Sequence, residues 1–185
     1  MFIQTEQTPN PSTLKFIPGE VVLDNGTMFF ENKDAAAVSP LASALFEITD
    51  VCAVFFGSDF VTVDNGGADW DAIKPAILST IMEHYTAGLP IVTGEVTDNA
   101  AADEADDADP EIVAQIQELL DTRVRPAVAR DGGDITYHGF KDGIVYLRMQ
   151  GACAGCPSST ATLKHGIQNL LKHYIPEIES VEAVI

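Results

Sequence analysis

An acidic stretch in the middle of the chain limits what the rest of it can fold into. Residues 94–110 read GEVTDNAAADEADDADP and carry seven acidic side chains, no basic ones and no aromatic ones. Such a segment cannot bury enough apolar surface to offset the entropy of ordering it, and its like charges repel one another. We therefore expect two small domains, residues 1–93 and 110–185, joined by a flexible acidic linker, residues 94–109.

The charge and cysteine content narrow the class of function. The formal net charge is -18 at pH 7, and there is no run of Lys and Arg of the kind that binds phosphate. No window approaches the ~18 apolar residues that a membrane span needs. We therefore expect no nucleic-acid and no membrane partner. Three cysteines are too few for a secreted disulfide framework, so the thiols are expected to be reduced, catalytic or metal-binding.

Alternating apolar residues and turn signals predict a small α+β fold for the N-terminal domain. Ser39 is a suitable helix cap and Pro40 a suitable first helical residue. Gly-Ser-Asp at 57–59 separates two apolar runs and predicts a hairpin. The predicted elements are strands at 2–7, 14–17, 27–31, 51–56 and 60–64, and helices at 40–48 and 70–85.

The C-terminal domain is also predicted to be α+β. Glycines at 132 and 133, after Asp131, allow the left-handed conformation that closes a helix, and Lys-Asp-Gly at 141–143 predicts a second hairpin. The predicted elements are a helix from 110 to about 131, strands at 135–140 and 144–149, a helix from about 158, and a strand at 178–185, in the order α-β-β-α-β.

Two cysteines lie where the second of these strands leads into the following helix. Residues 151–159 read GACAGCPSS and place Cys153 and Cys156 two residues apart. A thiolate needs stabilisation, and the amino end of a helix offers unpaired N–H groups and a partial positive charge beside Cys156, with Ser158 or Ser159 as a cap. The glycines and alanines leave the loop almost without side chains, which makes room for a bulky guest.

Three kinds of site fit this motif. A Cys-x-x-Cys pair can be a disulfide switch, half of a zinc site or half of an iron-sulfur site. Both tetrahedral zinc and the common iron-sulfur clusters take about four protein ligands, and one chain supplies two here. A two-fold dimer would bring four cysteines to one point. Zinc would fit the same sulfurs, and a buried structural pair is the least favoured alternative.

The motifs together resemble one family. Residues 125–134, RPAVARDGGD, with the hairpin and the segment at 151–159, resemble the NifU-like C-terminal domain of Nfu iron-sulfur carriers. Residues 3–19, IQTEQTPNPSTLKFIPG, and 55–63, FFGSDFVTV, are similar to the N-terminal domain of Nfu proteins from mitochondria and related bacteria. Both domains match in the family's order.

The resemblance implies a scaffold or carrier without catalytic turnover. Its members bind a [4Fe-4S] cluster, with [2Fe-2S] as the alternative, at a homodimer interface, here through Cys153 and Cys156. The implied donor is an upstream cluster-assembly scaffold, and the implied clients are apo iron-sulfur proteins. Mitochondrial members carry a presequence ahead of the matching segment, which here starts at the initiating Met, so we expect a bacterial cytoplasmic protein. The competing function is a thiol-disulfide oxidoreductase that uses the Cys153/Cys156 dithiol.

Other candidate residues are expected to be structural. Cys52 lies in an apolar run and is predicted to be a core residue. Asp-Gly-Gly-Asp at 131–134 is interpreted as a helix-to-strand turn rather than a cation loop. Arg125 and Arg130 are candidates for offsetting the charge of a thiolate cluster. No ligand spacing connects the four histidines, His84, His138, His165 and His173.

Overall fold

The computed structural model describes residues 2–94, 109–154 and 157–184. The chain divides into two compact units, Met1–Thr97 and Asp98–Ile185. Each unit combines helices with a sheet, which confirms the predicted α+β fold class. The boundaries at 93/94 and 109/110 stay a prediction, because most of the acidic segment lies outside the described residues.

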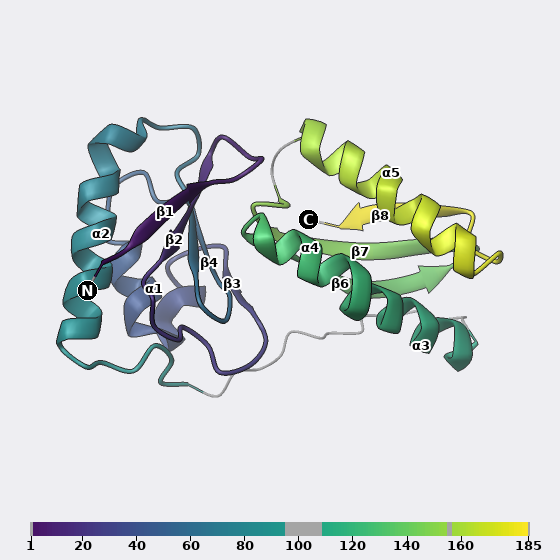
Figure 1. Cartoon of the computed structure of the whole chain (residues 1–185), viewed down its shortest axis with the longest axis horizontal. Helices are drawn as coiled ribbons and strands as arrows, with labels where there is room; N and C mark the ends of the chain where they lie inside the picture. Colours follow the sequence, from purple (N-terminus) through teal and green to yellow (C-terminus); the bar gives the residue numbers. More distant parts are fainter. Residues whose placement is uncertain (1, 95–108, 155–156, 185) are drawn as a thin grey trace. The chain divides into compact units, whose positions relative to one another are not determined.

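The N-terminal unit is a five-stranded antiparallel sheet with helices on one face (Figure 1). The strands follow the order β1-β2-β5-β4-β3 across the sheet. Their bounds are β1 (Gln4–Gln7), β2 (Thr13–Ile17), β3 (Met28–Phe30), β4 (Ala53–Phe56) and β5 (Val61–Asp64). The helices are α1 (Pro40–Leu45), α2 (Trp70–Thr86) and a 3-10 turn at Ala35–Val38 that the sequence pattern did not predict.

The predicted start of α1 is confirmed. The N–H of Ala42 donates to Ser39 Oγ at 3.1 Å, and Pro40 occupies the first helical position. Alternate residues of the central strands face α1 and α2 and form the core, because side chains point to opposite faces along a strand. The strand residues in this core are Leu14, Phe16, Phe30, Val54, Phe56, Val61 and Val63.

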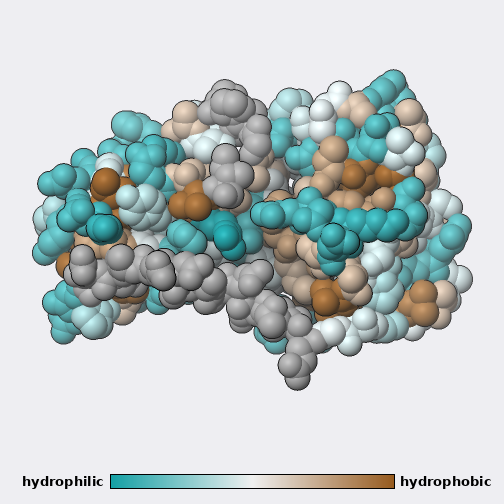
Figure 2. All heavy atoms as spheres, turned by 180° about the vertical axis from the view of Figure 1, so that it is seen from behind, coloured by the Kyte–Doolittle hydropathy of each residue, from teal (hydrophilic) through white to brown (hydrophobic). Residues whose placement is uncertain are grey.

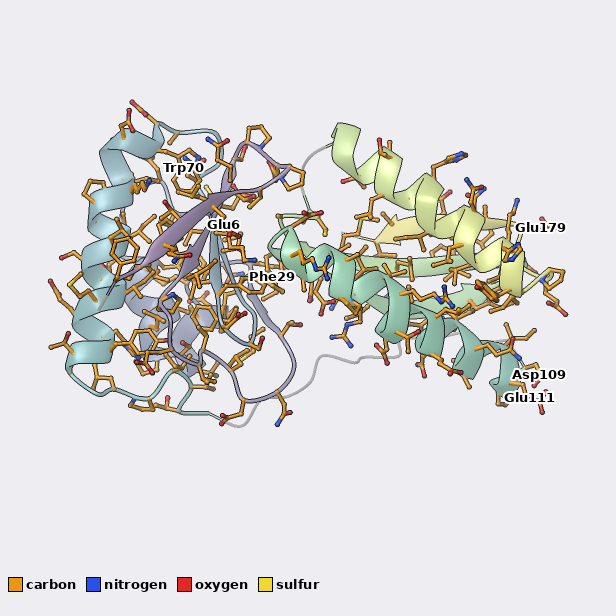
Figure 3. All side chains as sticks on the ribbon, viewed as in Figure 1. Glu6, Phe29, Trp70, Asp109, Glu111 and Glu179 are labelled. Carbon is orange, nitrogen blue, oxygen red and sulfur yellow. The ribbon has the colours of Figure 1, made fainter. Side chains whose placement is uncertain are left out.

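Asn10 organises the turn between β1 and β2. It is buried, and its carbonyl oxygen accepts from Thr8 Oγ1 at 2.8 Å while its side-chain Oδ1 accepts from the N–H of Ser12 at 3.0 Å. Trp70 Nε1 donates to the carbonyl of Pro11 at 3.2 Å, which attaches the turn to the start of α2 (Figure 3). The Thr-Pro-Asn-Pro segment is therefore a structural turn.

His84 gives the N-terminal unit a pH-dependent stability. It is 5% exposed, and its Nε2 has no hydrogen-bond partner among the described residues. Burial lowers the pKa of His84, and interactions with the backbone of Leu89 and Pro90 offset only part of that effect. The unfolded chain therefore binds more protons below about pH 6.5, so stability is complete above that pH and falls as the pH drops toward the folded-state pKa.

We expect the free energy of unfolding of this unit to fall between pH 7.5 and 5.5, with a His84 contribution of no more than about 1.3 kcal/mol. His84→Leu should lack that contribution. Trp70 is the only tryptophan, so its fluorescence during urea unfolding reports on this unit. An unchanged pH dependence in the variant would show that His84 is not the titrating group.

The C-terminal unit has the predicted α-β-β-α-β order. Strands β6 and β7 pair antiparallel, and β8 pairs parallel to β7 after a crossover through α5 (Figure 1). The helices share one core with the same face of the sheet. The element bounds are α3 (Pro110–Leu119), a π turn (Leu120–Val124), α4 (Arg125–Arg130), β6 (Gly133–Lys141), β7 (Ile144–Gly151), α5 (Pro157–Tyr174) and β8 (Ser180–Val184).

The hairpin and the helix start of this unit follow from their residue types. Asp142 and Gly143 have φ values of +49° and +77°, which is a two-residue turn of type I′ between Lys141 and Ile144. Asp109 begins α3, and its side chain accepts from the N–H of Glu111 at 3.1 Å (Figure 3).

The predicted single helix at 110–131 contains a π turn at its centre. Pro126 is the second residue after this turn, and proline can neither donate to the carbonyl four residues earlier nor avoid a clash with it. A π turn just before the proline accommodates both effects. The helical run is therefore continuous, as predicted, but locally widened.

None of the described helices is long and apolar enough to cross a membrane. On the face seen in Figure 2, hydrophobic residues lie in separate groups among hydrophilic ones.

Candidate functional site

The cysteine loop is held against the turn that precedes β6. Gly151 ends β7 with φ of +62°, and Gly132 in the turn has φ of +83°. The N–H of Ala152 donates to the carbonyl of Gly132 at 3.2 Å, and the N–H of Cys153 donates to the carbonyl of Gln150 at 3.3 Å. The described part of the loop therefore has a fixed backbone up to Ala154.

The loop connects β7 to α5, as predicted. α5 begins at Pro157, so Cys156 directly precedes the helix, but Cys156 itself lies outside the described residues. Thr160 Oγ1, in the first turn of α5, donates to the carbonyl of Cys153 at 3.2 Å. The loop is thus attached at both ends, to the Gly132–Gly133 turn and to α5.

Gly133 leaves the space that Cys153 occupies. It pairs with Gly151 across β6 and β7. A Cβ at Gly133 would lie 2.5 Å from Cys153 Sγ and 2.8 Å from both the Cys153 nitrogen and the Gln150 carbonyl oxygen. Only glycine therefore fits at this position.

Cys153 is a buried thiol. It is 6% exposed and forms no disulfide. Burial raises its pKa to about 12, and the negative charges of Asp134 and Asp131 add to this effect. The side chain is therefore protonated at neutral pH, which disfavours its use as an attacking thiolate in disulfide exchange.

Arg125 and Asp134 form a two-pronged ion pair beside this turn. Arg125 Nε and Nη2 donate to the two carboxylate oxygens of Asp134, each at 2.9 Å, and Nη1 donates to Asp121 at 2.9 Å. The N–H of Ile135 also donates to Asp134 Oδ1, at 2.8 Å. The hydrogen bond with Asp134 is the main reason why the pKa of Arg125 is raised. This pair fixes α4 to the first residues of β6, directly next to Gly133.

We expect Asp134→Asn to destabilise the C-terminal unit by about 2–3 kcal/mol, somewhat less than the loss of a fully buried ion pair. The Asp134 side chain is 3% exposed and that of Arg125 is 34% exposed, so solvent screens the pair only in part. Hydrogen exchange of the β7 amides measures this free energy directly.

Asp121→Asn is the matched control, because Asp121 binds the same guanidinium but is 60% exposed. Its effect should stay below about 0.5 kcal/mol. Equal effects of the two substitutions would contradict the assigned role of Asp134.

The structure contradicts the predicted burial of Cys52 and shows the ion-pair partners of Arg125. Cys52 is exposed, not a core residue, because it precedes β4 and the strand's alternation does not reach it. Arg125 forms ion pairs with Asp121 and Asp134, and its role in offsetting the charge of a cluster stays a prediction. The interpretation of residues 131–134 as a turn agrees with the backbone.

Cys153 belongs to no ready-made metal site among the described residues. That part of the chain contains no group of three or more His, Cys, Asp or Glu side chains that could hold a metal ion. The roles of Gly133 and Asp134 were missed by the sequence analysis. The signal for Gly133 was the Gly-Gly pair itself, whereas nothing in the spacing of Arg125 and Asp134 predicted their ion pair.

The C-terminal unit holds a cysteine loop of small residues between a strand and a helix, and the comparisons assign such a unit to the class of iron-sulfur scaffold proteins. Two family models match the chain: "NifU-like domain" over residues 116–182 and "Scaffold protein Nfu/NifU N terminal" over residues 3–88. The chain belongs to the Nfu/NifU-like iron-sulfur cluster scaffold family.

Similar proteins support this assignment. A human protein named "NFU1 iron-sulfur cluster scaffold homolog, mitochondrial" is 56% identical over the whole chain, which spans 72% of its length. A protein of the same name from Drosophila ananassae is 53% identical, and the chain spans 64% of its length. The solution NMR structure of a NifU-like protein from Saccharomyces cerevisiae is 25% identical, with a TM-score of 0.47 over 51% of this chain and 87% of that one.

These relatives overturn the expected location. The human and Drosophila proteins are named as mitochondrial, so the prediction of a bacterial cytoplasmic protein was wrong. The alternative of a thiol-disulfide oxidoreductase gains no support from the comparisons.

Proposed function

We propose that this protein binds an iron-sulfur cluster of the [4Fe-4S] type and delivers it to apo iron-sulfur proteins in mitochondria. Cys153 and Cys156 are the proposed ligands. The observation that carries the proposal is the placement of Cys153 in a fixed loop of small residues between β7 and α5, in a chain of this scaffold family.

A homodimer is the proposed form of the loaded carrier. Iron-sulfur clusters take four thiolates, and this motif supplies two from each chain. A two-fold axis through the cluster would bring the four sulfurs together. The residues that the structure describes contain no group of three potential metal ligands, which supports a site shared between two copies.

Loading requires a change at Cys153. Its thiol is buried and protonated, so the side chain must become accessible to iron and lose its proton. Iron supplies the positive charge that replaces the proton, as in other thiolate-metal sites. The empty carrier therefore keeps Cys153 in an unreactive thiol form.

Delivery follows as ligand exchange on the cargo. Cysteines of the client replace the carrier's cysteines on the irons, one bond at a time, and the dimer separates when none remain. The acidic segment at residues 94–109, proposed here as the tether between domains 1–93 and 110–185, would keep the cluster domain near a client bound elsewhere on the chain. No step converts a substrate chemically, so the proposed role is that of a carrier and not of an enzyme.

The test is transfer to an apo ferredoxin of the [4Fe-4S] type, under anaerobic conditions and with an iron chelator in excess. After reduction with dithionite, the ferredoxin's EPR signal should be restored by the loaded protein, whereas equal amounts of free iron and sulfide should not restore it. Transfer no faster than from free iron and sulfide would argue against a carrier role.

A further inference from the structure

Helix α2 has a second apolar stripe beside the one that enters the core. Ile73, Ile77 and Ile81 are the buried stripe. Leu78 and Met82 lie one position further along, and Met82 is 43% exposed although it is a large apolar residue. Residues four and seven positions apart lie on one helix face, so Leu78, Met82 and Tyr85 line up along the helix.

Two residues outside the helix extend this stripe. Tyr85 Oη donates to the carbonyl of Val21 at 3.2 Å, which places Val21, 61% exposed, beside the stripe. Leu89, 51% exposed, follows the left-handed Gly88 that ends α2, and its N–H donates to the carbonyl of His84 at 3.3 Å. We call Val21, Leu78, Met82, Tyr85 and Leu89 the α2 patch.

The clustering of these residues is unusual. Single exposed apolar side chains are common on protein surfaces, whereas contiguous ones mark interaction sites. Five large hydrophobic residues are strongly exposed in the described part of the chain, and three of them, Val21, Met82 and Leu89, belong to the α2 patch. Leu78 and Tyr85 pack in part against the core of the N-terminal unit, whereas Val21, Met82 and Leu89 are exposed beside them.

Acidic residues border the α2 patch. Burial raises the pKa of Tyr85, and the negative charge of Glu20, which precedes Val21, adds to this effect. Glu83 follows Met82 on the helix. Residues 1–94 contain 12 acidic and 3 basic side chains. Two of the three bases are paired, Lys15 with Glu6 and Lys33 with Glu47. The third, Lys74, lies one turn from Leu78, at the far end of the stripe.

We propose that the α2 patch binds a basic amphipathic helix of a partner protein. The helical part of the patch, from Leu78 to Tyr85, covers about 10 Å of helix axis, which matches about two turns of a partner helix packed alongside, and Leu89 extends the patch past the end of α2. Apolar residues of that helix would contact the stripe, while its Lys and Arg side chains would face Glu20 and Glu83. A second copy of this chain would bring the same acidic residues together, so we exclude it as the occupant. The proposal does not depend on cluster binding.

The test uses the full-length protein and a fluorescently labelled 14-residue peptide, LKKLLKLLKKLLKL, which forms a basic amphipathic helix. Anisotropy should show binding that weakens with salt and that the variant Met82→Glu reduces at least tenfold. Tyr174→Ser is the matched control, since Tyr174 is 46% exposed but lies in the other unit, and should bind as the wild type does. Trp70 fluorescence verifies that Met82→Glu is folded.

Three results would overturn the proposal: no binding of the peptide, equal binding by the wild type and Met82→Glu, or equal binding of a scrambled peptide of the same composition. Binding of the wild type to phosphatidylcholine vesicles without peptide binding would also overturn it, in favour of a lipid surface.

Discussion

Replacing Cys153 or Cys156 by serine is expected to abolish cluster binding while leaving both units folded. Each dimer would lose two of its four thiolates in either variant, and a hydroxyl is a poor ligand for iron. Cys153 packs in the C-terminal core, but serine is nearly the same size, so the fold should survive with a modest loss of stability. Iron and sulfide assays after anaerobic reconstitution measure the effect, and far-UV circular dichroism measures the fold.

Cys52→Ser is the control that tests whether the loss of any cysteine lowers the iron content. Cys52 is an exposed free cysteine in the N-terminal unit, and its replacement should leave the iron content unchanged. A Cys153→Ser/Cys156→Ser double variant that still forms a stable cluster would show that the ligands lie elsewhere.

Replacing Gly133 by alanine is expected to prevent cluster loading without touching a ligand. The added Cβ would overlap with Cys153 Sγ and with the backbone of both Cys153 and Gln150. Two of these contacts are with main-chain atoms that hydrogen bonds hold in place, so the loop itself must move. Such overpacking typically costs about 1–3 kcal/mol, and we expect most of the bound iron to be lost as well.

Gly139→Ala is the matched control in the same strand, because a Cβ at Gly139 would meet nothing within 4 Å. It should load normally and keep its stability. Both variants are compared by iron content and by hydrogen exchange of the β7 amides. Normal loading of Gly133→Ala would contradict the role assigned to the turn before β6.

Much of the fold could be predicted because local signals agreed with the tertiary structure. Asp142 and Gly143 suit a type I′ hairpin, and Ser39 with Pro40 suits a helix start, so both were predicted correctly. The π turn at Leu120–Val124 was not predicted, since hydrophobic periodicity at this length does not distinguish it from an α-helix. Pro126 was the visible signal, but a proline alone does not locate such a turn, because Pro75 lies inside α2.

The site was predictable in its residue types but not in its packing. The spacing of Cys153 and Cys156 and the small residues around them indicated a metal or cluster loop. The close contact between Gly133 and Cys153 depends on strand register, and the Arg125–Asp134 pair depends on how α4 meets β6. Cys52 was assigned wrongly to the core because an apolar run alone does not show where a strand begins.

Native mass spectrometry of the anaerobically reconstituted protein tests the central proposal most directly. It reports chain number, iron and sulfide in one species. The proposal predicts two chains with one cluster of four irons and four sulfides, and separation into monomers when the cluster is removed. A monomer without iron that cycles a disulfide between Cys153 and Cys156 would contradict it.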